Sequence, residues 1–448
     1  MFKGVGVSFL AIVLSVSALT HRSYGQDQQA LLLLDEKEVL DKRIKLIEQE
    51  TQEITAVYYL WDGVDIGLAA LAAYRAAALR GVKVRIMFDG LSVLDTGKLP
   101  EKLKEALEAI IPSASVTRAI FNSLKKNCVE AKVFNPLDFN KLNHYVTLGL
   151  FSREHEKITY FKSQNTVLLG DRNWQAINFR MNAKYAGHSY RSVEVLVKSE
   201  KAANAVAAHL NNMWDHSEKV RFAKTEGISE QEEEAVSQKM DQLLESLKTS
   251  PARVESCAEP ISVRSVRFIH DIMDKKREES GMERDLIALI KRARHNITII
   301  SPYFSWTKRV EAALNDAIRY HSVRVKIYVP TLSTTDAPLS SAVFELQARR
   351  LSQYPGYDLY LHSGQDMLHG KVIKIDDHIS VISSHNLDFV SEFINYESGF
   401  VIDSIPFGRQ TDQFIKQVDS ESKPYQKQEL SWGNKLAGQI AKWFIEHW

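Results

Sequence analysis

One stretch of the chain, residues 368–388, collects side chains that could act on a phosphate ester. His369 and Lys371 stand two residues apart on a run that predicts a β-strand, so both side chains point to the same face. A second apolar run completes a hairpin, and Ser384 and Asn386 come at its end. Imidazole can attack phosphorus or transfer protons near neutral pH, while ammonium, amide and hydroxyl groups can bind phosphoryl oxygens. The pattern therefore predicts phosphodiester chemistry.

Residues 155–174 repeat this arrangement. His155 and Lys157 are again two residues apart, two apolar strands again follow, and Asn173 ends the second. The histidine precedes its asparagine by 18 residues here and by 17 residues in the other copy. Two copies favour one site in which one histidine becomes a phosphohistidine and the other acts as general acid and base. The pattern leaves open which histidine is the nucleophile.

Carboxylates near the two motifs are expected to hold the second ring nitrogen of each imidazole and so to fix its tautomer. Glu397 is the candidate after the second motif, and Glu194 is the candidate after the first. Asp376 lies five residues beyond the lysine of the second motif, where strand alternation turns it away from the catalytic face and predicts a supporting role. Lys162 stands at the corresponding place in the first motif. The chemistry needs no metal and no cofactor.

The elements around both motifs also repeat. A β-α-β pattern, which implies parallel strands and a right-handed crossover, precedes each motif. The chain therefore predicts two similar α/β lobes, each a mixed sheet flanked by helices. The predicted strands are 54–59 and 82–89 before the first motif, and 296–302 and 323–329 before the second.

The predicted division of the chain follows from this repeat. Residues 201–283 are polar and highly charged, with helix formers, and predict a helical connector between the lobes. The C-terminal tail carries a tryptophan-rich segment that predicts a helix packed on the core or, alternatively, at a membrane surface. The segments are a signal peptide (1–25), an N-terminal lobe (26–200), the connector (201–283), a C-terminal lobe (284–403) and a helical tail (404–448).

The first residues predict export. Lys3 precedes a 15-residue apolar run, Val5–Leu19, which is shorter than a membrane span, and small residues precede Gln26. An uncleaved anchor is the alternative. We expect a periplasmic or secreted protein, with membrane association open. An oxidising compartment permits a disulfide between Cys128 and Cys257, although spacing alone does not show whether they meet.

The composition excludes some classes of protein. The chain has 448 residues, of which 44% are hydrophobic and 25% charged, so a disordered or multi-span membrane protein is excluded. Lysine and arginine total 57 against 56 acids, a net charge of +1. Without a basic excess, nucleic acid is not the expected partner.

Both motifs resemble the phospholipase D superfamily, whose signature is His-x-Lys-x4-Asp followed by Gly-Ser-x-Asn. The second motif matches it except that Ser383 replaces the glycine, and the first differs mainly at Lys162. Within the superfamily the chain is most similar to bacterial cardiolipin synthases, in Gly170–Trp174 and in the run RGVKVRIMFD. The resemblance implies two lobes with one active site at their interface. It also places Asp336 and Arg349 where that family has an acid and a base in its second lobe.

The resulting hypothesis is an exported phospholipase D-like enzyme that cleaves or transfers phosphatidyl groups through a phosphohistidine. Its expected substrate is phosphatidylglycerol or a similar phospholipid, reached by peripheral contact with a membrane. Two alternatives stay open: an exported nuclease of the same superfamily, and a lipid-binding homologue whose catalysis is impaired by Lys162. We expect the first motif to contribute to catalysis despite Lys162. The oligomeric state is not predicted.

Overall fold

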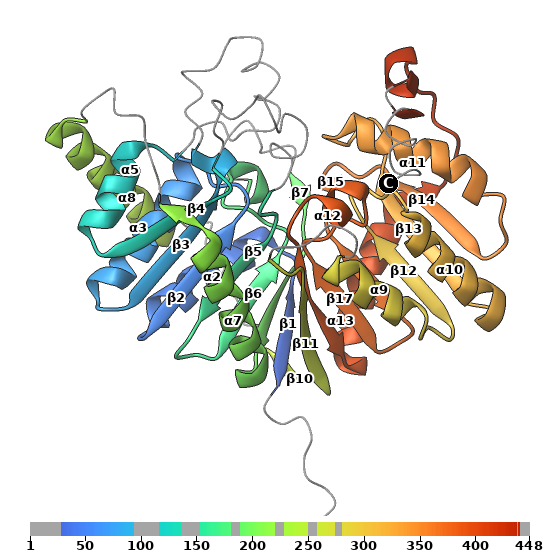
Figure 1. Ribbon diagram of the computed structural model, residues 1–448, viewed down its shortest axis with the longest axis horizontal. Helices are drawn as coiled ribbons and strands as arrows, with labels where there is room; N and C mark the ends of the chain where they lie inside the picture. The colour runs from blue at the N-terminus through green and yellow to red at the C-terminus, as the bar shows by residue number, and fades with distance from the viewer. Residues whose placement is uncertain are drawn as a thin grey trace, which may run out of the picture.

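The computed structural model describes residues 28–93, 116–136, 153–180, 189–219, 228–249, 258–273, 280–436 and 438–439. The chain forms two α/β lobes whose sheets stand side by side, each with helices on its outer face (Figure 1). The predicted signal peptide and Cys257 lie outside the described residues. Cys128 is exposed. Because Cys257 lies outside the described residues, the permitted disulfide stays a prediction.

The N-terminal lobe is built on a nine-stranded sheet in which the three strands β2, β3 and β4 are parallel and the remaining pairings are antiparallel. Its strands lie in the order β10 (Ile261–Ser262), β1 (Gln29–Leu33), β8 (Glu194–Lys198), β6 (Thr166–Gly170), β5 (Lys157–Phe161), β2 (Glu53–Tyr58), β3 (Lys83–Asp89), β4 (Val129–Phe134) and β9 (Glu218–Lys219).

The C-terminal lobe repeats this plan in an eight-stranded sheet, with β12, β13 and β14 parallel. Its strands lie in the order β11 (Ser265–His270), β18 (Ser398–Asp403), β17 (Ile379–Ser383), β16 (Val372–Ile375), β12 (Asn296–Ile300), β13 (Arg324–Pro330), β14 (Tyr357–His362) and β19 (Ser422–Pro424). From β1 to β4 and from β11 to β14 the two sheets have the same strand order and directions. The predicted pair of similar lobes is confirmed.

Helices cover the sheets because their apolar faces match the buried alternate residues of the strands. The outer face of the first sheet is covered by α2 (Glu36–Gln49), α3 (Asp65–Leu79), α5 (Arg118–Lys126) and α8 (Glu230–Thr249). The outer face of the second sheet is covered by α9 (Gly281–Ile290), α10 (Lys308–His321) and α11 (Pro338–Leu351). None of the helices in the described ranges is both long and apolar enough to span a bilayer.

The inner faces of the two sheets share one hydrophobic core. It contains β-strand residues of both lobes together with α7 (Glu200–His216) and α13 (Ile405–Ser420). A further strand pair crosses between the lobes, where β7 (Tyr190–Arg191) pairs in parallel with β15 (Met367–Leu368). Both hairpins that carry the motifs are thus buried on two faces, which holds their side chains in fixed positions.

The predicted connector, 201–283, is part of both lobes. It holds the expected helices α7 and α8, but α8 packs on α3 and α5, and its strands β9, β10 and β11 extend the two sheets. The predicted tail, 404–448, begins with α13 between the lobes and continues as edge strand β19. Trp432 in this tail is 81% exposed, and residues 440–448 lie outside the described part.

Candidate active site

The two motif histidines meet at the lobe interface. His155 lies just before β5, and its backbone N–H donates to the carbonyl of Tyr396 in the other lobe at 3.2 Å. His369 lies between β15 and β16, and its backbone N–H donates to the carbonyl of Arg191 in the first lobe at 3.0 Å. Each histidine is therefore positioned by its own strand and by a backbone group of the opposite lobe.

The His155 imidazole is held by a carboxylate of the C-terminal lobe. Its Nδ1 lies 2.9 Å and 3.1 Å from the two carboxylate oxygens of Glu397, which is fully buried immediately before β18. The hydroxyl of Ser384 donates to the same carboxylate. Burial, followed by the charges of Lys157 and Lys371, holds the pKa of His155 well below its usual value. A neutral ring with its proton on Nδ1 leaves the Nε2 lone pair available.

The His369 imidazole is held by a carboxylate of the N-terminal lobe. Its Nδ1 lies 3.1 Å from Oδ2 of Asp171, which is fully buried. Burial acts to raise the pKa of Asp171, but the hydrogen bond from His369 and the charge of Lys371 outweigh it, so this pKa is lowered and Asp171 is ionised. Burial and then Lys371 lower the pKa of His369, while Asp171 acts in the opposite direction.

The two motif lysines are buried beside the histidines. Lys371 Nζ lies 3.1 Å from Nε2 of His369, and 3.0 Å from its carbonyl oxygen. Lys157 Nζ donates to the carbonyl of His155 and lies 5.1 Å from the centre of the Tyr59 ring. Burial lowers the pKa of Lys157 to about 7 and that of Lys371 to about 8. Two weakly hydrated cations in one site are suited to bind an anion that brings its own negative charge.

The two asparagines and the serine follow the second strand of their hairpins. Asn173 uses its side-chain oxygen to accept the backbone N–H of Leu60 at 3.0 Å, which leaves its amide donor group for other contacts. Asn386 is buried, and its side-chain oxygen has no partner among the described residues. Ser384 was expected to bind phosphate, but its hydroxyl donates to Glu397. Its role in the described structure is thus to position the carboxylate that holds His155.

The prediction for Glu194 is wrong. Its carboxylate accepts from the Arg43 guanidinium on the outer side of the sheet, with Nε and Oε2 3.3 Å apart, while Asp171 holds His369. Glu397 does orient an imidazole, but that of the opposite lobe. The two hairpins give a signal that sequence reasoning missed: Asp171 and Ser384 both stand two residues before the asparagine. The carboxylate thus sits on the hairpin in one lobe and on the following strand in the other.

The family match agrees with this geometry. Residues 286–420, which contain the second motif, match the family described as "Cardiolipin synthase, PLD-like domain". Over this segment the chain is therefore similar to phospholipase D-like domains. It is 22% identical to cardiolipin synthase B of Escherichia coli K12, over 95% of this chain and 89% of the relative. It is 24% identical to cardiolipin synthase C of the same strain, over 81% and 78% of the two chains.

A solved structure shares the fold of this chain along nearly its whole length. The phosphatidylserine synthase of Haemophilus influenzae Rd KW20 superposes with a TM-score of 0.63 at 13% identity, covering 93% of this chain and 92% of the other. At that identity the likeness concerns the fold alone. It supports the two-lobe arrangement that brings both motifs to one interface.

The aspartate of the second motif, Asp376, supports a strand and does not orient the histidine. It sits in the β16–β17 turn with a φ of 51° and accepts the backbone N–H groups of Arg294, His295 and Asn296 at 3.1, 2.8 and 3.1 Å. These groups begin β12, the strand that pairs with β16. Asp376 therefore fixes the hairpin at the end opposite the active site.

Glu50 supports the hairpin of the first lobe, where Lys162 stands in place of the aspartate. Its buried carboxylate accepts the N–H groups at the start of β2, from Thr51 at 3.0 Å and Gln52 at 2.8 Å, and also that of Ser163 at 2.9 Å. Lys162 points to Glu53, 3.9 Å away. The missing aspartate is thus replaced by a carboxylate from elsewhere in the chain, and the first motif keeps its hairpin.

The two lysines set an expected alkaline limit on activity. A lysine attracts a phosphodiester only as the ammonium ion, so kcat/KM should fall as the pH rises through the Lys157 pKa of about 7 and the Lys371 pKa of about 8. Lys157→Arg keeps its charge, and its alkaline limb should move up toward the Lys371 value. The measurement is kcat/KM against pH for both proteins. A wild-type profile that stays flat to about pH 9 would contradict this assignment.

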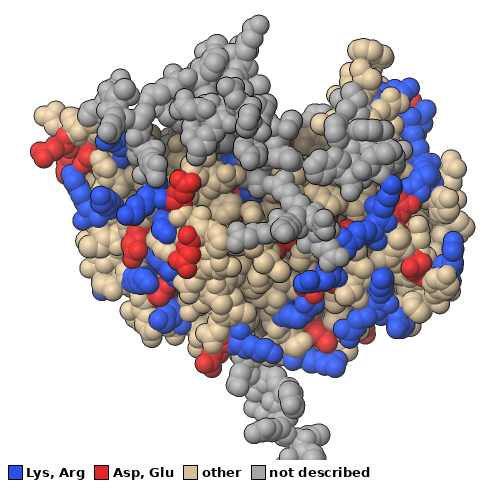
Figure 2. Space-filling model, viewed as in Figure 1, with Lys and Arg blue, Asp and Glu red and all other residues tan. Residues whose placement is uncertain are grey.

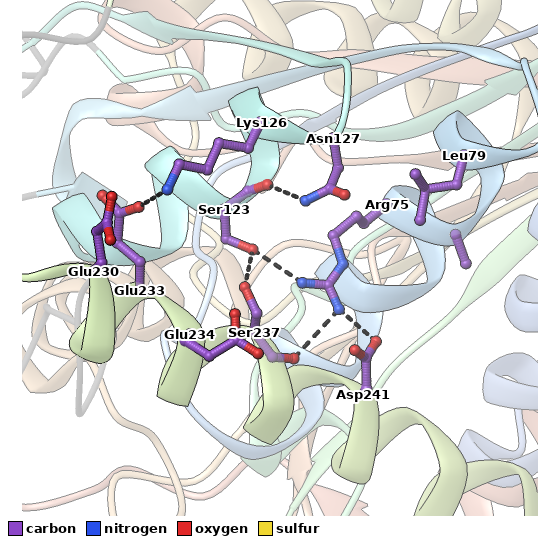
Figure 3. A pocket seen from close by; sticks show the side chains of 11 residues that line it. Arg75, Leu79, Ser123, Lys126, Asn127, Glu230, Glu233, Glu234, Ser237 and Asp241 are labelled. Atoms are coloured by element: carbon purple, nitrogen blue, oxygen red, sulfur yellow. Dashed lines mark hydrogen bonds and ion pairs between the residues drawn. The ribbon is translucent and has the colours of Figure 1, made fainter.

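A surface hollow lies away from this site, between α3, α5 and α8, with a volume of about 530 Å³ (Figure 3). Its polar groups bond to one another: Arg75 donates to Ser123 at 2.9 Å and pairs with Asp241, and Lys126 pairs with Glu233. These pairs join α8 to the N-terminal lobe.

On the face in Figure 2, basic side chains stand out most over the C-terminal lobe and mix with acidic ones over the N-terminal lobe.

Proposed function

We propose that this protein transfers phosphatidyl groups between alcohols, or to water, through a phosphohistidine, with phospholipids as donors. The observation that carries the proposal is the reciprocal pairing of the two imidazoles, each held at Nδ1 by a buried carboxylate of the opposite lobe, beside two buried lysines. The match to cardiolipin synthases supports a phosphatidyl donor, and phosphatidylglycerol as both donor and acceptor would give cardiolipin.

We assign attack on phosphorus to His155. Its pKa is well below the usual value, and burial raises the pKa of its partner Glu397 to about 7. Glu397 therefore carries little negative charge that would stabilise the protonated form of His155. His369 instead faces the ionised Asp171. A bound phosphodiester offsets the charge of Lys371, after which Asp171 stabilises the His369 imidazolium. His369 is therefore the better proton carrier.

The proposed steps balance. Nε2 of His155 forms a bond to phosphorus as the bond from phosphorus to the headgroup oxygen breaks, and His369 gives its proton to that oxygen. The headgroup leaves as a neutral alcohol. An incoming alcohol or water then gives its proton to His369 while its oxygen attacks phosphorus, and the phosphorus–nitrogen bond breaks. Lys157 and Lys371 stabilise the extra charge in both transition states.

Location on the outer side of a membrane is part of the proposal. The apolar N-terminal run supports export to the periplasm or beyond, where phospholipids are available. Exposed Val390 on α12 (Phe389–Phe393) and Trp432 in the tail are candidates for peripheral contact with the lipid surface.

Two other functions make different predictions. A nuclease of the same superfamily would use the same two histidines on DNA, which a zymogram with DNA in the gel would reveal. A catalytically impaired lipid-binding protein would bind vesicles and form no product. Glu50 argues against the second alternative, since it restores the hairpin support that Lys162 lacks.

The deciding experiment is product analysis on vesicles of phosphatidylglycerol, with EDTA present, with and without ethanol. We expect cardiolipin without ethanol and phosphatidylethanol with it. Phosphatidate alone would make the protein a hydrolase. His369→Ala is the inactive control, and His378→Ala, at the exposed β16–β17 turn, is the matched control that should keep full activity. No product from any phospholipid would refute the proposal.

A further inference from the structure

The residue between His155 and Lys157 is itself a buried acid. Glu156 is fully buried, and both of its carboxylate oxygens lie 2.9 Å from Nε2 of His209, which is buried on α7. The backbone N–H of Glu156 donates to Oε1 of Glu154, another fully buried acid, at 3.0 Å. The proposed transfer steps use neither acid. A buried charge is costly unless it is paired, so Glu156 and His209 have to be considered together.

Glu156 is the charged member of the two acids. Burial acts to raise the Glu156 pKa, but the charge of His209 and its hydrogen bond outweigh burial, so this pKa is lowered and Glu156 is ionised. Burial and then the charge of Glu156 hold the pKa of Glu154 well above its usual value, so Glu154 stays protonated. The ionised carboxylate that follows His155 in the chain is thus paired with an imidazole of α7.

His209 also reaches the other lobe. Its helix, α7, packs on β5, β6 and β8 of the first sheet and on β11 of the second. The centre of the His209 ring lies 4.2 Å from that of His270, the last residue of β11, and 5.5 Å from that of Phe268. Nδ1 of His270 donates to the carbonyl of Asp271 at 2.7 Å. His209 therefore joins the segment that carries His155 to the end of a strand in the C-terminal lobe.

The residue after β11 holds the backbone of Glu397. The N–H of Asp271 donates to the Glu397 carbonyl at 2.9 Å, and Oδ2 of Asp271 accepts the Glu397 N–H at 3.2 Å. Asp271 is fully buried, and its Oδ1 accepts the hydroxyl of Ser280 at 2.7 Å. The contacts therefore form a closed ring, from His155 through its own neighbour to His209, and back through Asp271 to the carboxylate that holds the imidazole.

We propose that His209 is a positioning residue, which keeps His155 aligned with Glu397 by linking the two lobes next to that pair. The two side chains come from different lobes, so their 2.9 Å contact depends on how firmly the lobes are joined there. The inference rests on the proposed transfer, because it concerns the alignment of the proposed nucleophile. A misplacement of about 1 Å at a reacting group can cost about 10²-fold in rate.

The first test compares His209→Leu with His209→Gln in turnover of phosphatidylglycerol vesicles. Glutamine can place an amide N–H near the Glu156 carboxylate, whereas leucine has no donor. His209→Leu should lower kcat about 100-fold and leave KM within about twofold, and His209→Gln should recover kcat to within about fivefold of wild type. His216→Gln, at the exposed end of the same helix, is the matched control and should change neither value. Equal losses in the two His209 variants, or a change in KM alone, would overturn the proposal.

A double variant separates positioning from stability. His209→Leu alone leaves Glu156 as an unpaired buried charge, which destabilises the fold. Glu156→Leu combined with His209→Leu replaces the buried pair by apolar side chains, so the melting temperature should stay within a few degrees of wild type. Its kcat should nevertheless stay about 100-fold low, because the link between the lobes is missing. Wild-type kcat in this double variant would show that the link has no positioning role.

A measurement without turnover separates this proposal from the transfer reaction. The Nδ1 proton of His155, bonded to Glu397, should exchange slowly with solvent and give a low-field NMR signal in protein labelled with ¹⁵N-histidine. The matching proton of His369, bonded to Asp171, is the internal reference. The double variant should lose the His155 signal and keep that of His369. If it does so in a protein that makes no transfer product, the proposed function fails and the positioning role stands. If both signals persist, or both are lost, the positioning role fails whatever the activity.

Discussion

Replacing either motif histidine is expected to stop turnover of natural phospholipids, but the two variants should fail at different steps. His155→Ala removes the proposed nucleophile, so no covalent intermediate should form. His369→Ala removes the proposed general acid and should lower kcat about 10³-fold on a donor with an alkoxide leaving group. On a phosphatidyl ester of p-nitrophenol, whose leaving group needs no proton, His369→Ala should still release about one equivalent of phenol and then stall.

The measurement is the burst of p-nitrophenol together with mapping of the phosphorylated histidine by mass spectrometry. A burst from His155→Ala with none from His369→Ala would reverse the two roles. Near-normal turnover by either variant would exclude a mechanism that uses both motifs. Because the residues act as one unit, the double variant should be no slower than His155→Ala alone.

The second large effect concerns stability. Glu50→Ala is expected to lower the free energy of unfolding by about 3 kcal/mol, because backbone N–H groups at the start of β2 lose a buried charged acceptor. The melting temperature in thermal denaturation should fall by several degrees. Lys162→Asp in the Glu50→Ala background should recover part of the loss, since it supplies the acceptor that Asp376 supplies in the other lobe.

Two controls make this assignment specific. Lys162→Asp alone should be neutral or destabilising, because it adds a carboxylate near Glu50 and Glu53. Burial acts to raise the Glu50 pKa, but its hydrogen bonds prevail and lower it, so its contribution is present above the unfolded-state value of 4.5. The difference between wild type and Glu50→Gln should therefore shrink as the pH falls below 4.5 and through the lower folded-state pKa. A gain of activity in Lys162→Asp would mean that the first motif is impaired after all.

The placement of the motif side chains could be predicted from sequence because strand alternation is a local property. His155 and Lys157 share a face whatever surrounds them, and the repeated β-α-β pattern is enough to predict two similar lobes. The partners of the imidazoles could not be predicted, since the interface between the lobes decides them. Glu397 lies 242 residues after His155, and a reading confined to one lobe assigned Glu194 instead.

The supporting groups escaped prediction for a related reason. Asp376 could be identified because it belongs to the second motif. Glu50, which supports the equivalent turn of the first lobe, lies 112 residues before Lys162 and outside the motif. Only the pairing of β2 with β5 brings the two together. The connector boundaries failed similarly: residues 201–283 have the composition of a solvated linker, yet three short strands within them extend the sheets. Edge strands of two to six residues carry too little periodicity to be recognised.

Because the lobes exchange carboxylates, each half of the chain supplies the group that orients the motif histidine of the other half. A separated N-terminal half would hold His155 without Glu397, and a separated C-terminal half would hold His369 without Asp171. Neither fragment could complete one turnover, while a mixture that re-forms the shared core would regain both pairs. Activity in such a mixture would be proportional to the concentration of assembled complex. Fragment complementation could therefore measure the affinity between the two halves of this enzyme.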